Sequence, residues 1–225
     1  MAKIAILLED QYQVLEAWYP YLRFKENGGE TFFVGSGRSK TYTSKEGYPA
    51  TEDRSIDAVT ADDFDGVIIP GGYSPDMMRR KPRMAEFVRE MFDAGKLVAA
   101  ICHGGWMLAS AGVLKGKRAT GFPSIKDDMT NAGAAFVDEE VVVDGNLVTS
   151  RRPSDLPAFC QAILGVLGEE NPSALHAEAA YAKSLADFAG PGLTADHRRP
   201  FELEGSTEAE ETTSRGARKA RRKSE

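Results

Sequence analysis

The stretch Val98-Ala99-Ala100-Ile101-Cys102-His103-Gly104-Gly105 decides the fold of this 225-residue chain. Its four apolar residues predict a buried strand, and its two glycines allow the backbone to bend closely behind Cys102. Residues 106–110 then predict a helix. A side chain between a buried strand and a helix sits on a tight turn at the carboxyl end of the strand, where open α/β sheets form their sites. We therefore predict that Cys102 is the reactive centre.

Strand-like and helix-like segments alternate on both sides of this turn. The predicted strands are residues 3–8, 31–34, 66–69 and 97–101, and the predicted helices are residues 12–27, 84–94, 106–110 and 156–167. Such alternation is typical of a parallel sheet covered by helices on both faces. Two hairpins interrupt it, one over residues 41–50 around Glu46-Gly47 and one around Asp144-Gly145-Asn146.

The composition changes near residue 168. Residues 1–168 hold the whole α/β pattern, and the alanine-rich residues 169–190 predict a helical extension that ends at Gly190-Pro191-Gly192. Residues 191–225 are predicted to be a disordered charged tail. From residue 205 onward this tail has six basic and four acidic residues and no large apolar side chain, so it cannot offset the entropy of ordering. A solubilising role is favoured over contact of its basic end with nucleic acid.

Bulk properties exclude several classes of function. The net charge of −6 argues against a nucleic-acid surface on the whole protein, so only weak contact through the basic tail remains open. No stretch approaches the roughly 20 apolar residues that span a membrane. The apolar N-terminus runs directly into Glu9-Asp10, which favours a core strand over a signal peptide. With two cysteines we expect no disulfide framework and a cytoplasmic location.

The residues around Cys102 favour a reactive thiol. The helix behind it points an N-terminus with partial positive charge at the sulfur, which stabilises a thiolate. A packed, inert cysteine is the alternative on the turn alone, and it is the interpretation that we prefer for Cys160. A second turn, Pro70-Gly71-Gly72, ends another strand. Its backbone N–H groups would form an oxyanion hole beside a thiolate, although alone these residues fit an ordinary turn.

The order of several separated blocks resembles the PfpI family of the ThiJ/PfpI superfamily over residues 3–168. The blocks are Tyr19-Pro20-Tyr21, Pro70-Gly71-Gly72, Ala100-Ile101-Cys102-His103-Gly104, Ile125-Lys126-Asp127-Asp128-Met129, Asn131-Ala132-Gly133, Val141-Val142-Val143-Asp144-Gly145-Asn146 and Ser150-Arg151. The resemblance implies a flavodoxin-like three-layer α/β sandwich with a mostly parallel sheet and a cysteine at the nucleophile elbow.

The resemblance also implies roles for particular residues. Cys102 is then the nucleophile, and His103 is its partner in catalysis. The acidic residue that assists them comes from a neighbouring subunit and corresponds to Asp76. The amides of Gly71, Gly72 and His103 would bind the oxyanion. A triad completed between subunits implies a homo-oligomer, which we expect to be a dimer, trimer or hexamer.

Two positions depart from the family pattern as we align it. The family has a glutamate in the first βα loop, and an ungapped alignment through Tyr19-Pro20 places Gln13 there. Glu9 and Glu16 lie near in sequence but do not align with this position, and of the two we expect Glu9, at the end of the first strand, to reach the pocket. Glutamine can donate a hydrogen bond but cannot relay a proton at neutral pH. Phe122 stands where a tyrosine is common, and we expect it to line the pocket together with Tyr73.

Two classes of function follow from these residues. The first is a cysteine-dependent hydrolase or lyase, with deglycase, glyoxalase and peptidase or amidase activities all open. Its substrate would be a small aldehyde, a glycated compound or an amide, attacked by the Cys102 thiolate. The second is a redox or stress sensor that works by oxidation of Cys102. The loss of the family's usual glutamate and tyrosine, at Gln13 and Phe122, favours this hypothesis somewhat. Cys102 and His103 are the only plausible soft ligands near each other, so we expect no metal site and no cofactor.

Overall fold

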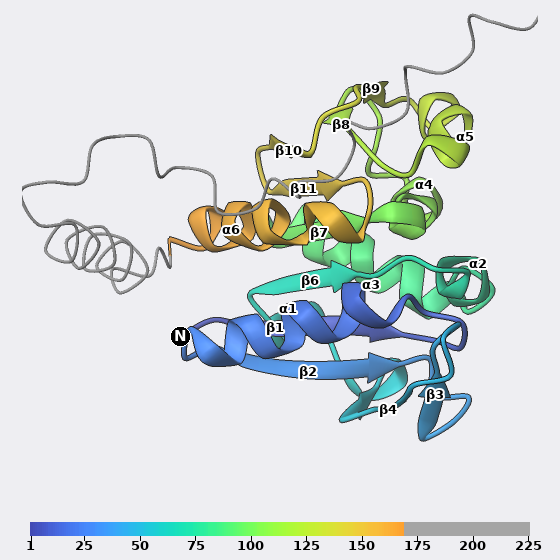
Figure 1. Ribbon diagram of the computed structural model, residues 1–225, viewed down its shortest axis with the longest axis vertical. Helices are drawn as coiled ribbons and strands as arrows, with labels where there is room; N and C mark the ends of the chain where they lie inside the picture. The colour runs from blue at the N-terminus through green and yellow to red at the C-terminus, as the bar shows by residue number, and fades with distance from the viewer. Residues whose placement is uncertain (169–225) are drawn as a thin grey trace, which may run out of the picture. The chain divides into compact units, whose positions relative to one another are not determined.

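Residues 1–168, which the computed structural model describes, fold into three layers: a central sheet with helices on both faces (Figure 1). This confirms the predicted α/β sandwich with a mostly parallel sheet. The predicted extension at 169–190 and the predicted tail at 191–225 lie outside the described residues.

The central sheet has seven strands within the described residues, and six of them run parallel. In spatial order they are β10 (Val141–Asp144), β11 (Leu147–Ser150), β7 (Leu97–Ile101), β6 (Gly66–Ile69), β1 (Lys3–Leu8), β2 (Glu30–Gly35) and β5 (Arg54–Ser55). The edge strand β10 pairs antiparallel with β11 through the predicted hairpin, whose Gly145 has a positive φ of 65°. Two small sheets join β3 (Thr41–Thr43) to β4 (Pro49–Thr51) and β8 (Arg118–Ala119) to β9 (Ala135–Phe136).

Six α-helices accompany these strands in residues 1–168. They are α1 (Val14–Glu26), α2 (Ser74–Met78), α3 (Pro82–Asp93), α4 (Gly105–Ala111), α5 (Lys126–Asn131) and α6 (Leu156–Val166). None of the described helices is both long enough and apolar enough to cross a bilayer.

The order of the strands places a crevice above the middle of the sheet. From β1 the chain moves outward through β2 to β5, then returns to β6 on the other side of β1 and moves outward again through β7. The direction of winding therefore reverses between β1 and β6. In α/β sheets, ligands bind at such a switch point, beyond the carboxyl ends of the strands. The loops after β1, β6 and β7 meet there.

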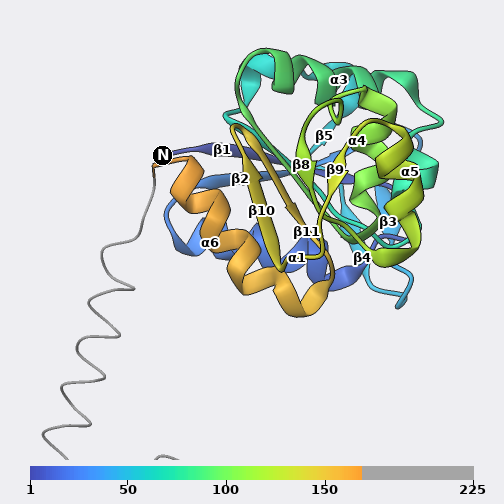
Figure 2. The same cartoon turned by 90° about the horizontal axis from the view of Figure 1, so that it is seen from above.

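Alternate residues of the central strands point into opposite helical layers, as expected for a strand. In β1, Ile4 and Ile6 belong to the cluster that includes residues of α1 and α6, whereas Ala5 and Leu7 belong to the cluster with α3 and α4. Figure 2 shows α1 and α6 on one side of the sheet and α3 and α4 on the other. Burial on both faces explains why these strands are continuous apolar runs.

Helix α1 turns a different face to the sheet from the one that its apolar spacing indicates. The apolar residues Leu15, Tyr19 and Leu22 are exposed, while Glu16 and Phe24 are buried. Glu16 is four residues before Pro20 and eight before Phe24, so all three lie on one stripe of the helix. A carboxylate thus stands at the start of the buried face, above the carboxyl end of the sheet.

The β3–β4 hairpin holds the loop between β1 and α1 in place. The Thr43 N–H donates to Asp10 Oδ1 at 2.8 Å, and the Gln11 N–H donates to the Thr43 carbonyl at 2.8 Å. At the tip, Glu46 Oε2 accepts from the Val14 N–H at 3.2 Å, which satisfies a free donor at the start of α1. The hairpin therefore fixes the position from which α1 presents Glu16.

Candidate active site

Cys102 occupies a sharp elbow between β7 and α4. Its φ of 59° lies in the left-handed region that L-residues avoid, so the turn carries backbone strain at the sulfur-bearing residue. Gly104 is required directly behind it, because a Cβ there would lie 2.5 Å from the Ile69 carbonyl oxygen. The elbow is thus pressed against the end of β6. Only 7% of Cys102 is exposed, which leaves room for small reactants alone.

His103 lies against the sulfur with its ring held on several sides. Its Nδ1 is 3.2 Å from Cys102 Sγ, and its Nε2 is 3.1 Å from the hydroxyl of Ser124. The ring stacks on Phe122, with centroids 4.8 Å apart, and meets Trp106 edge-on at 5.1 Å. Burial, with a smaller contribution from the Lys45 charge, lowers the pKa of His103 below its ordinary value. A neutral imidazole carries one N–H and accepts a proton at its other nitrogen.

Glu16 supplies the carboxylate beside the sulfur. It is completely buried, its Oε2 accepts from the Gly71 N–H at 2.7 Å, and its carboxylate is close enough to the Cys102 sulfur for each group to influence the pKa of the other. The prediction that Gln13 occupies this place is wrong. Gln13 is the N-cap of α1, where its Oε1 accepts from the Glu16 N–H at 2.8 Å and its Nε2 points to Glu46. Capping turns the Gln13 side chain back onto the helix end.

Glu16 and Cys102 share one environment and therefore compete for a proton. Burial raises the pKa of Glu16 to about 7. Burial, and next the Glu16 charge, raise the pKa of Cys102 to about 12. Two negative charges in one apolar pocket are disfavoured, so near neutral pH the pair retains one proton. When Glu16 holds that proton, it can donate it to a thiolate.

Of the three backbone N–H groups predicted to form the oxyanion hole, two remain available. The Gly71 N–H is already committed to Glu16 and is not available to a substrate oxygen. The backbone N–H groups of Gly72 and His103 point at the Cys102 sulfur and favour its thiolate form. These two donors lie where an oxyanion next to the sulfur would form.

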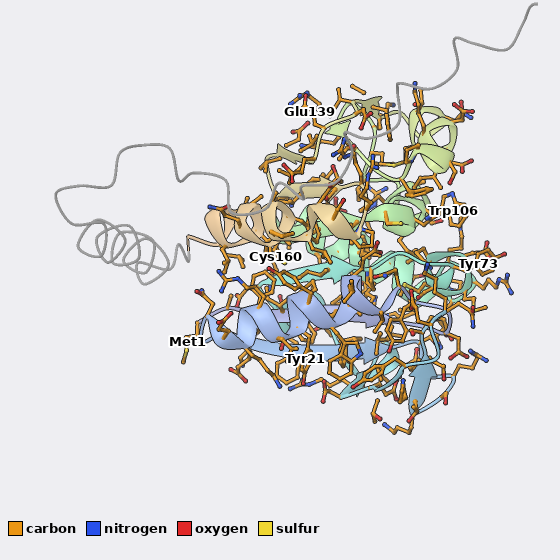
Figure 3. All side chains as sticks on the ribbon, viewed as in Figure 1. Met1, Tyr21, Tyr73, Trp106, Glu139 and Cys160 are labelled. Atoms are coloured by element: carbon orange, nitrogen blue, oxygen red, sulfur yellow. The ribbon has the colours of Figure 1, made fainter. Side chains whose placement is uncertain are left out.

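The remaining predicted site residues divide into two groups. Phe122 lies at the site, since its ring stacks on His103 and its N–H donates to the Cys102 carbonyl at 3.2 Å. Tyr73 is half exposed, and its ring meets Trp106 at 6.5 Å. Figure 3 shows these two labelled residues close together at one edge of the molecule, with Cys160 apart from them on α6.

Glu9 and Asp76 have other partners. The buried carboxylate of Glu9 bonds to Ser36 and, at 2.6 Å, to Arg38, so it does not serve the pocket as predicted. Asp76 forms an ion pair with Arg80 one turn later on the same chain. Its predicted action on a neighbouring subunit stays a prediction. Among residues 1–168, no three histidine, cysteine or acidic side chains gather in a way that could hold a metal ion.

The raised pKa of Glu16 predicts a stability that falls with rising pH. The unfolded chain releases the proton near 4.5 and the folded chain near 7, so the fold loses stability across that interval. Glu16→Gln removes this penalty. We expect the free energy of unfolding of Glu16→Gln, relative to wild type, to rise by about 2 kcal/mol between about pH 5 and pH 8.

Urea unfolding of both proteins at the two pH values measures this difference. Glu26→Gln, at an exposed carboxylate on the same helix, is the matched control and should show no comparable trend. A pH-independent difference for Glu16→Gln would contradict the shared-proton arrangement.

Comparisons with known proteins agree with this geometry. The model of the DJ-1/PfpI family matches residues 2–165. A deglycase of Pyrococcus abyssi is 46% identical over 165 residues, which are 73% of this chain and 99% of that protein. Protein/nucleic acid deglycase 2 of Escherichia coli is 44% identical over 168 residues, 74% of this chain and 98% of that protein.

A solved structure is similar as well. A two-domain protein of Anabaena variabilis with DJ-1/ThiJ/PfpI-like and ferritin-like domains superposes with a TM-score of 0.73 at 43% identity. The match covers 76% of this chain and 52% of that one.

Proposed function

Because this chain belongs to the DJ-1/PfpI family, we propose that it is a deglycase-type enzyme in which Cys102 attacks small carbonyl adducts of amines or thiols. One observation carries the proposal. Cys102 lies within reach of a buried carboxylate, an imidazole and two free backbone donors, all supplied by one protomer. Relatives at 44–46% identity bear the name deglycase, which favours this activity over peptidase or glyoxalase chemistry.

The proposed attack uses each of these groups once. In a methylglyoxal adduct the amine nitrogen is on the hydroxyl-bearing carbon next to the ketone. The sulfur forms a bond to that carbon as the carbon–nitrogen bond breaks, and the bonding electrons leave with the amine. The thiol proton passes to Nδ1 of His103, 3.2 Å away, which gives it to the departing amine. Transfer of a proton from the sulfur-bearing carbon to the neighbouring carbonyl carbon, through an enediol, then gives a lactoyl thioester. Water attacks the thioester carbonyl, whose oxygen the N–H groups of Gly72 and His103 stabilise, and releases lactic acid and the free thiol.

Glu16, when protonated, lowers the energetic cost of forming the buried Cys102 thiolate. An ionised Glu16 raises the pKa of Cys102, whereas a protonated Glu16 can donate to the sulfur. Its own pKa of about 7 keeps both forms populated at neutral pH. The site therefore has a carboxylate at this position, as the family pattern requires. The argument for a redox sensor from a missing glutamate loses its basis, whereas the argument from Phe122 is unaffected.

The experiment that tests this function supplies a methylglyoxal adduct of N-acetylarginine to the full chain. We expect free N-acetylarginine and lactate to appear in equal amounts, at rates proportional to enzyme concentration. A wild-type protein that releases neither product would contradict the proposal. Hydrolysis of a peptide amide with no release from the adduct would show a peptidase instead.

The predicted homo-oligomer is a separate proposal. The exposed apolar side chains of Leu15, Tyr19 and Leu22 form a stripe on α1 that assembly would cover. We expect multi-angle light scattering to give a multiple of the chain mass for the wild type. Replacing Leu15 and Leu22 with glutamate should give the monomer mass, because two charges would have to be buried. An unchanged mass would place the interface elsewhere.

A further inference from the structure

Ser124 completes a chain of contacts through His103 inside one protomer. Its hydroxyl lies 3.1 Å from Nε2, while Nδ1 of the same ring lies 3.2 Å from the Cys102 sulfur. Ser124 belongs to the short 3-10 turn Pro123–Ile125 that follows Phe122. Phe122 in turn bonds to the Cys102 carbonyl and stacks on the imidazole, so the turn is attached to the elbow at two further points.

We propose that Ser124 is a positioning residue that holds the His103 ring with Nδ1 facing the Cys102 sulfur. This inference rests on the proposed role of Cys102. A neutral imidazole carries one N–H, and Nδ1 must be bare to accept a proton from the sulfur. When the hydrogen is on Nε2, the Ser124 oxygen, 3.1 Å away, can accept it. The same oxygen also stabilises the imidazolium that forms after transfer.

Ser124 holds the ring from within the same protomer. It is exposed, so its own hydroxyl hydrogen can point to water while its oxygen faces the ring. In this protomer Asp76 is ion-paired to Arg80, so among the described residues Ser124 is the hydrogen-bond partner of Nε2.

Three variants of the full chain test this arrangement. Ser124→Ala removes the hydrogen-bond partner of Nε2, and Ser124→Thr keeps a hydroxyl there. Ser110→Ala is the matched control, because Ser110 is an exposed serine bonded to Arg79 and not to the site. Steady-state deglycation gives kcat and KM, and iodoacetamide labelling of Cys102 as a function of pH reports its thiolate.

We expect Ser124→Ala to lower kcat about five- to tenfold with KM changed less than about twofold. The midpoint of Cys102 labelling should move up by about one pH unit or less, because the imidazolium beside the thiolate loses a partner. Ser124→Thr should return kcat to within about twofold of wild type. Ser110→Ala should leave both measurements unchanged.

Two results would overturn the inference. They are a Ser124→Ala protein equal to wild type in kcat and labelling, and a Ser124→Thr protein as impaired as Ser124→Ala. The proposed function fails separately. If the wild type does not deglycate, the labelling midpoint of Ser124→Ala still decides whether Ser124 positions His103. An active wild type with an unaffected Ser124→Ala refutes Ser124 alone.

Discussion

Replacing Cys102 with alanine is expected to lower kcat/KM for deglycation by at least about a thousandfold. The substitution removes the atom that forms the bond to the substrate carbon, and no other described group can take its place. Cys160 is the only other cysteine, and it is buried on α6, where burial raises its pKa to about 12. The fold should persist, since the substitution removes a single buried sulfur and leaves the backbone at this positive-φ residue unchanged.

Cys160→Ala is the control for this prediction. It removes a buried sulfur of the same kind from the core and should cost about 1 kcal/mol of stability while kcat/KM stays at the wild-type value. Product release by both variants, measured under the same conditions, separates chemistry from folding. Appreciable activity in Cys102→Ala, or its loss in Cys160→Ala alone, would contradict the assignment of the nucleophile.

Gly71→Ala is expected to produce the second-largest effect, a fall in kcat/KM of about a hundredfold or more. A Cβ on Gly71 would lie 2.7 Å from Cys102 Cβ, 2.7 Å from Glu16 Oε2 and 2.8 Å from the His103 nitrogen. One added methyl group would thus clash with Cys102, with Glu16 and with the backbone of His103. Moving these residues apart to make room would change the distance between the carboxylate and the sulfur. Overpacking should also lower the free energy of unfolding by about 1–3 kcal/mol.

Gly165→Ala provides the matched control for this crowding. Gly165 lies in α6 with no atom within 4 Å of an added Cβ. Alanine there should raise the free energy of unfolding by up to about 1 kcal/mol, because glycine weakens a helix, and activity should not change. Urea unfolding and deglycation assays on both variants measure the contrast. Wild-type activity in Gly71→Ala would contradict the structure, because it would show that the pocket has space for the added methyl group.

The sequence predicted the parts of the fold that depend on long patterns. The four principal predicted strands and the four predicted helices recur in the structure, because continuous apolar runs and caps specify them locally. Helices α2 and α5 and strand β5 were not predicted. Each has six residues or fewer, too short for periodicity to show, and each depends on contacts with distant segments.

The site was predicted at Cys102 and missed at Glu16. The ungapped alignment placed the family's glutamate at Gln13. Such an alignment matches residues by their number along the chain and does not show where helix α1 begins. Glu16 is in the first turn of the helix, and helical side chains tilt toward the N-terminus, which brings its carboxylate back over Gly71. A signal was present: Glu16 shares its helical stripe with Pro20 and Phe24. An acid on the buried stripe of a helix indicates a site more strongly than a polar residue in the loop before it.

Ser124 carried no sequence signal at all. It stands 21 residues after His103 in a short turn, and only the folding of β8 and the following turn against the elbow brings the hydroxyl to the ring. Gly71 was assigned correctly to the site but to the wrong acceptor, because the sequence could not show that Glu16 already occupies its N–H.

The most direct test of the account is to trap the covalent intermediate. The full chain is mixed with a methylglyoxal adduct, quenched in acid within one turnover, digested and examined by peptide mass spectrometry. The account predicts a mass increase on the peptide that contains Cys102 and none on the peptide that contains Cys160. Turnover without any modification of Cys102, or an intermediate carried by another residue, would contradict it.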